Sequence, residues 1–258
     1  MVGDKCQKRL RLPHQNLRKF WPLNLSMSPE IAQTNIRYIF EFSDSNTEAF
    51  DLKIDRNTGK RIPEQQNEFP DWARLSFEKC PNCPLIETES EFCPAAIALM
   101  DTVRRLGRTL SHAKVHLVVI LEDRWIGRKT TSQTAISSFM GLQIATSGCP
   151  NADFLRPMAR FHLPLSTPDE TLTRTVGMYF LRQFFRAQSG ASFDMDLEGL
   201  KRSYSELQTV NSFIARRLRA SKEITEMNAF AALDQLAQLI PLQIEDALDD
   251  VRRLFTES

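Results

Sequence analysis

Four cysteines in this chain have the residue type and the spacing of a single metal site. They follow the pattern C-x2-C-x9-C-x55-C, and each is followed directly by proline: Cys80, Cys83, Cys93 and Cys149. Four thiolates match the tetrahedral shell of a structural zinc ion, and they also match the ligand set of a [4Fe–4S] cluster. The sequence therefore predicts one metal centre on these cysteines, holding either Zn or [4Fe–4S].

Two further observations bear on this prediction. Cysteine followed by proline recurs at ferredoxin clusters, which strengthens the iron–sulfur option without deciding between the two metals. The alternative is four buried free thiols, because cysteine is among the most frequently buried residue types. The fifth cysteine, Cys6, lies in the N-terminal segment and is not expected to join the site.

His162 is the weak candidate for a catalytic residue. Its side chain is of the type that titrates near neutral pH, and it follows Cys149 by 13 residues in a segment that also contains Arg156 and Arg160. We expect His162 to lie beside the metal region. With the two arginines it could act on an anionic substrate, so an enzyme is the alternative to a binding, regulatory or redox protein.

A second weak candidate is an anion site at a helix start. Arg124, Arg128 and Lys129 precede Thr131, where a helix is predicted to begin. Free N–H groups at a helix N-terminus, together with nearby cations, attract anions. The competing interpretation is a solvated basic loop.

The charge of the chain is unevenly distributed. Residues 1–26 contain six Lys and Arg against one Asp, a net charge of +5, and the rest of the chain has a net charge of −4. We expect residues 1–26 to form a basic, disordered tail that could bind an acidic partner. The overall charge of +1 gives no strong nucleic-acid signal.

Hydropathy predicts a cytoplasmic protein that does not enter the membrane. The longest aliphatic run, 117–121, is far shorter than the roughly 20 residues that span a bilayer, and no signal-peptide pattern precedes it. Thiols stay reduced in the cytoplasm, so clustered cysteines there favour metal binding over disulfides.

The pattern of apolar residues predicts an α+β fold with a small antiparallel sheet of about 3–4 strands, packed with a helix-rich C-terminal half. Alternation predicts strands at 35–42, 50–54, 73–79 and 115–121. Helical periodicity predicts helices at 94–111, 131–147 and 167–190, a further helix capped by Asp196, and two more at 222–240 and 242–256. Residues 27–258 are expected to form one domain, with the metal joining its two halves.

Four motifs carry a resemblance to a known family. They are the segments CPNCPL at 80–85, FCPA at 92–95, ATSGCP at 145–150 and RPMARFHLP at 156–164. With these motifs the chain resembles an uncharacterised bacterial family of unknown function, over most of residues 35–240. The resemblance implies a bacterial cytoplasmic domain and no mechanism.

Overall fold

The fold is built on a four-stranded antiparallel sheet with the strand order β2-β1-β3-β4. The structure is a computed structural model, and it describes residues 33–43, 46–63, 68–220 and 254. The strands are β1 (Gln33–Phe42), β2 (Thr47–Asp55), β3 (Lys114–Ile120) and β4 (Trp125–Thr131). This sheet and the helices that follow it confirm the predicted α+β class.

One face of the sheet carries the core. Alternate residues of β1 are buried, and the register places Tyr38 opposite both Phe50 of β2 and Val119 of β3. The Tyr38 and Phe139 rings lie 4.6 Å apart between centroids, and the Phe50 and Phe139 rings lie 5.0 Å apart. A strand has a side-chain period of two, so this alternation turns one face towards the helices.

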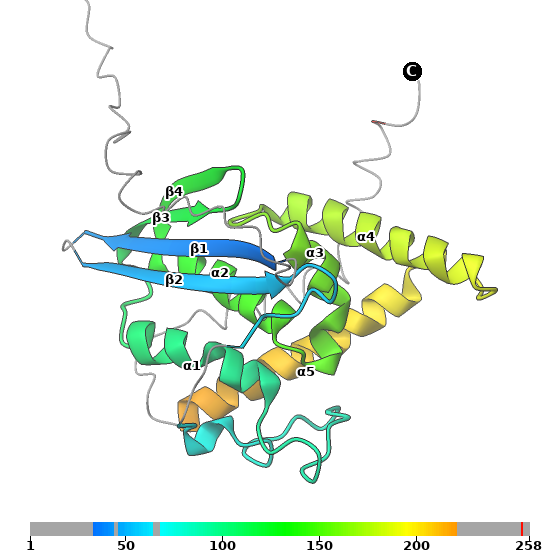
Figure 1. The fold of residues 1–258 in the computed structure, drawn as a ribbon, viewed down its shortest axis with the longest axis horizontal. Coiled ribbons are helices and arrows are strands. Elements are labelled where there is room, and N and C mark those ends of the chain that lie inside the picture. The colour runs from blue at the N-terminus through cyan, green and yellow to red at the C-terminus, as the bar shows by residue number, and fades with distance from the viewer. Residues whose placement is uncertain (1–32, 44–45, 64–67, 221–253, 255–258) are drawn as a thin grey trace, which may run out of the picture. The chain divides into compact units, whose positions relative to one another are not determined.

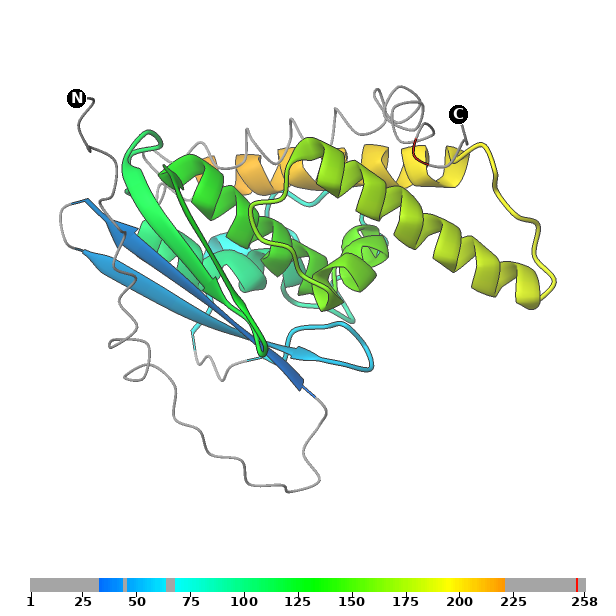
Figure 2. The same ribbon diagram turned by 90° about the horizontal axis from the view of Figure 1, so that it is seen from above.

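The helices lie together on that face of the sheet (Figures 1 and 2). In the described part of the chain they are the 3-10 helices η2 (Asp71–Ala73) and η3 (Pro150–Leu155) and the α-helices α1 (Pro94–Leu106), α2 (Ser132–Thr146), α3 (Arg156–Arg160), α4 (Pro168–Gln188) and α5 (Glu198–Ala220). None of these described helices is long and apolar enough to cross a membrane.

Two helix ends follow from local sequence as predicted. The Thr167 side chain accepts the N–H of Glu170, and the Glu170 carboxylate accepts the N–H of Thr167, so the capping box at the start of α4 is complete. After α2, Gly148 has a φ of +87°, a left-handed conformation that glycine adopts at low cost. This turn leads the chain directly into Cys149.

The strand predicted at 73–79 is absent from the described structure. The segment forms η2 and a series of turns, joined to Phe92 only by an isolated antiparallel bridge from Arg74. Buried and exposed residues alternate along this segment, as they do in a strand. In the described structure, however, no neighbouring strand forms a continuous series of hydrogen bonds with it. Arg217 of α5 instead donates hydrogen bonds to the main-chain carbonyls of this segment.

The region predicted as a basic loop before α2 is strand β4. Arg128 and Lys129 lie within it, and its whole length pairs with β3. Most of its side chains are exposed, so no alternation of apolar residues marked it as a strand.

Asp194, rather than Asp196, accepts the N–H of Gly199 at the start of α5, at 2.8 Å. The predicted tail at 1–26 and the predicted helices at 222–240 and 242–256 lie outside the described residues, apart from Leu254.

Candidate functional site

Each of the four cysteines lies at a turn or at the start of a helix. Cys80 and Cys83 flank a turn in which the N–H of Cys83 donates to the carbonyl of Cys80, at 3.0 Å. Cys93 is the N-cap of α1 and Cys149 is the N-cap of η3, each with proline at the first helical position. All four are free thiols, half-buried at Cys80 and Cys83 and buried at Cys93 and Cys149.

Hydrogen bonds tie these cysteine segments to one another. The Asn151 side chain in η3 donates to the carbonyl of Asn82, at 3.0 Å, and so joins the 80–83 turn to the segment after Cys149. The Asn82 side chain donates to the carbonyl of Glu206 in α5, at 3.1 Å. The N–H of Cys93 donates to the carbonyl of Ala73, at 2.8 Å. Segments remote in sequence are therefore held side by side.

The thiols also influence one another electrostatically. Burial, with smaller contributions from Cys93 and Cys83, raises the pKa of Cys80 to about 11. Burial raises the pKa of Cys149 to about 12, with Cys93 and Cys80 adding to the rise and two N–H groups of η3 opposing it. Cys80 and Cys149 therefore each lie within electrostatic range of Cys93.

Hydrogen bonds join the cysteine segments, but the thiols of the described residues are not arranged as a coordination shell. Over the described residues, no three His, Cys, Asp or Glu side chains are already arranged to hold a metal ion. Binding would require the thiolates to turn towards a common centre, which rotation about the Cα–Cβ bond allows for a short side chain.

Arg217 is a fully buried cation beside this cluster. Its side chain is 1% exposed, and Nη1 donates to the carbonyls of Trp72, at 2.6 Å, and Arg74. Burial lowers the pKa of Arg217, and the proximity of the Cys93, Cys80 and Cys83 sulfurs and of the Glu78 carboxylate opposes this. Among the described residues it forms no ion pair with a carboxylate. A buried charge of this kind is costly unless a counter-charge faces it.

Sequence reasoning missed Arg217, although a signal was present. It falls on the buried side of α5, in step with Val210 and Ile214. A cation within an apolar stripe indicates either a buried ion pair or an anionic site.

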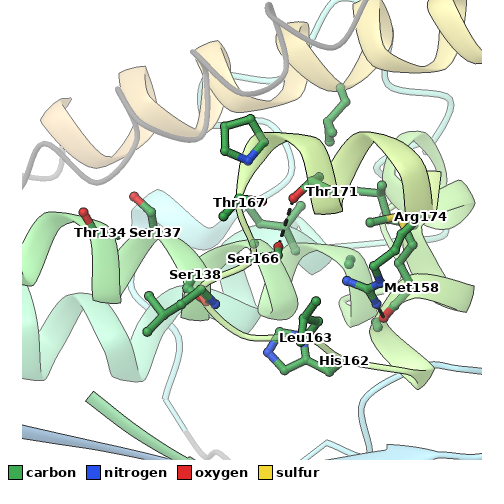
Figure 3. Close-up of a pocket in the computed structure, with 18 of the residues that line it drawn as sticks. Thr134, Ser137, Ser138, Met158, His162, Leu163, Ser166, Thr167, Thr171 and Arg174 are labelled. Carbon is green, nitrogen blue, oxygen red and sulfur yellow. Dashed lines mark hydrogen bonds between the residues drawn. The ribbon is translucent and has the colours of Figure 1, made fainter. Parts of the chain in front are cut away.

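His162 lies away from the cysteine cluster, contrary to expectation. Its Nε2 is 2.5 Å from the hydroxyl of Tyr38, which in turn lies 3.3 Å from that of Ser138. The eight residue steps from Ser138 to Thr146 correspond to a rise of about 12 Å along α2, towards Cys149. His162 instead lines a cavity of about 470 Å³ between α2, α3, α4 and α5 (Figure 3).

Arg156 and Arg160, the two arginines predicted to act with His162, are engaged elsewhere. Arg156 pairs with Asp153, and Arg160 lies over the ring of Phe161, 5.3 Å from its centroid. Neither is among the described residues that line the cavity. Two other arginines, Arg128 and Arg174, line this cavity with His162, and sequence reasoning missed Arg174.

The three residues of the predicted anion site are separated. Arg124 pairs with Asp123, at 2.7 Å, and Arg128 lines the cavity. Lys129 is exposed on β4. The start of α2 is capped by the Thr131 side chain, which accepts the N–H of Thr134.

The fold and the site define an α+β domain with four cysteines gathered at turns and helix starts. The chain belongs to the family described as a domain of unknown function (DUF6901), whose model matches residues 36–256. Comparison with curated proteins and with solved structures gave no match in either set.

Proposed function

We propose that Cys80, Cys83, Cys93 and Cys149 bind one metal centre, either Zn or [4Fe–4S], in a protein with a binding, regulatory or redox role. The buried guanidinium of Arg217 is the observation that carries this proposal. Four thiolates around a divalent ion, or around a four-iron cluster, give a centre of net negative charge. Such a centre would add negative charge beside Arg217 that neutral thiols do not provide, in addition to the charge of the nearby Glu78 carboxylate.

The two metals imply different roles. Zinc would join the 80–83 turn, the start of α1 and the start of η3, as structural zinc sites do. A [4Fe–4S] cluster would instead carry electrons or respond to oxidants. A closed shell of four thiolates leaves no open position, which argues against hydrolysis at the metal in either case.

The test is metal analysis of the full chain purified without oxygen. A brown protein with about four irons per chain identifies a cluster. A colourless protein with about one zinc per chain identifies a structural site. Neither metal, with all four thiols reacting freely in the folded protein, would overturn the proposal.

Cysteine variants assign the ligands. We expect Cys80→Ser, Cys83→Ser, Cys93→Ser and Cys149→Ser each to lose most of the bound metal. The matched control is Cys6→Ser, which should retain it. Equal metal content in all five variants would contradict this ligand set.

A pair of adjacent arginines on α5 tests the role assigned to the guanidinium. Arg217→Met should bind metal more weakly than the wild type, because it removes the buried counter-charge. Arg216→Met is the control, since Arg216 is exposed and lies over Phe213, 4.6 Å from its ring centroid. Competition with a chromophoric chelator measures the metal affinity of both variants. Equal affinities would show that Arg217 does not contribute to metal binding.

A further inference from the structure

The cavity lined by His162 has the size and composition of a small-molecule site. Its volume of about 470 Å³ lies within the range of roughly 300–1,000 Å³ that is typical of ligand pockets. Much of the wall is apolar, with contributions from Ile144, Leu155, Met158 and Leu207. Figure 3 shows hydroxyl groups of α2, from Thr134 and Ser137, at one side, and Arg174 of α4 at the other.

The charges on the wall are of one sign. The described lining residues include two arginines, Arg128 and Arg174, and no aspartate or glutamate. The carboxylate of Glu170 raises the pKa of Arg174, against the effect of burial. The same carboxylate accepts the N–H of Thr167 in the capping box of α4. The described lining is mostly apolar and its charged members are both arginines, which favours an anionic ligand.

Arg174 retains free hydrogen-bonding capacity. Its Nη2 donates to the carbonyls of Met158, at 3.3 Å, and Phe161, at 2.5 Å. Nε and Nη1 have no hydrogen-bond partner among the described residues. Two main-chain carbonyls thus fix the guanidinium, while its remaining donors stay available to a ligand. Arginine held in this way is well suited to bind a carboxylate.

His162 adds a neutral polar group. Its ring is held by the Tyr38 hydroxyl, and burial lowers its pKa to about 3, so it is uncharged at neutral pH. Nδ1 has no hydrogen-bond partner in the described part of the chain. The ring can therefore orient a ligand by hydrogen bonding without adding a charge.

We infer that this cavity binds a small organic acid, with its carboxylate at Arg174 and its apolar body between α2 and α5. This site goes beyond the metal proposal and does not depend on it. The cavity uses none of the four cysteines, and Asn211, its lining residue on α5 nearest to Arg217 in sequence, is separated from Arg217 by about 9 Å along the helix.

The ligand chemistry is tested on the full chain as purified, with three probes that share one apolar body. Octanoate, octanol and octylamine carry alkyl chains of nearly equal length, with a head group that is anionic, neutral or cationic. Titration calorimetry should show binding of octanoate at least about 10-fold tighter than octanol, the discrimination expected of a charge-assisted hydrogen bond, and no binding of octylamine. Equal binding of octanoate and octanol would overturn the inference. So would binding of inorganic phosphate as tight as that of octanoate, because the apolar wall would then play no part.

Three arginine variants locate the site. Arg174→Met should weaken octanoate binding about 10-fold to 100-fold, and Arg174→Lys should weaken it less, because it keeps the charge. The matched control is Arg160→Met, which removes a nearby arginine outside the cavity wall and should leave the affinity unchanged. An unchanged affinity in both Arg174 variants, or an equal loss in Arg160→Met, would overturn the inference. If Arg174→Met fails to fold, Arg174→Lys and the probe series on the wild type still decide the result.

Discussion

At the residue scale, two arginines of the described chain carry the two proposals. Several arginines pair with carboxylates, as Arg74 does with Glu91 at 2.8 Å. Arg217 and Arg174 donate to main-chain carbonyls and form no ion pair with a described carboxylate. Surface ion pairs contribute little to stability, whereas a buried cation needs a counter-charge. The proposed metal centre is therefore argued from Arg217, and the proposed organic-acid site from Arg174.

His162 gives a prediction for the pH dependence of stability. Its pKa is about 3 in the folded protein, below the ordinary value of 6.5, so the unfolded chain binds the proton more readily. The stabilisation is present at neutral pH and is lost as the pH falls from 6.5 towards 3. The free energy of unfolding should fall by up to about 1.4 kcal/mol per pH unit between about pH 6 and about pH 4.

Urea denaturation across this pH range measures the effect. His162→Gln should show a shallower decline than the wild type, because glutamine does not titrate. The control is His112→Gln, since His112 is exposed, and its decline should match that of the wild type. Identical profiles for all three proteins would refute the assignment to His162.

At the element scale, helix ends place the functional side chains. Cys93 and Cys149 are N-caps, so proline at the next position fixes where each helix begins and where each thiol lies. The positive φ of Gly148 turns the chain from α2 into Cys149. A change at one of these ends would therefore move a proposed metal ligand as well as reduce stability.

The capping box of α4 gives the element-scale prediction. Thr167→Ala removes the acceptor of the Glu170 N–H and should lower the free energy of unfolding by about 1 kcal/mol. Thr173→Ala, at an exposed position in the same helix, is the control and should cost nothing, because alanine favours a helix. Chemical denaturation compares the two, and an equal loss in both would show that the cap contributes nothing specific.

At the scale of the whole molecule, α5 connects the two candidate sites. Tyr204 and Leu207 line the cavity, and Arg217 lies over the segment that leads to Cys80. The same helix packs against η2 and η3, the elements adjacent to the cysteines. Loading of the metal centre should therefore stabilise contacts among segments far apart in the sequence.

Removal of the metal gives the prediction at this scale. At a free metal concentration about 100 times Kd, the bound form should be about 2.7 kcal/mol more stable than the stripped form. Limited proteolysis of the stripped protein should cut first in the exposed stretch 85–91, which the centre no longer holds. Cys93→Ser is the control, because a chelator should change neither its stability nor its cleavage. An unchanged wild type after chelation would exclude a structural role for the metal.

The sequence alone determined the elements that depend on near neighbours. The β1–β2 hairpin, α2 with Gly148 after it and the capping box of α4 follow from alternation, helical periodicity and short-range hydrogen bonds. Tertiary structure alone decided that 73–79 is not a strand and that the mostly exposed β4 is one. It also decided that Arg217 is buried beside the thiols and that His162 shares a cavity with Arg174. These features depend on contacts between residues remote in sequence. Arg217 did leave a local signal, its position in the apolar stripe of α5, but the groups that it contacts are set by tertiary structure.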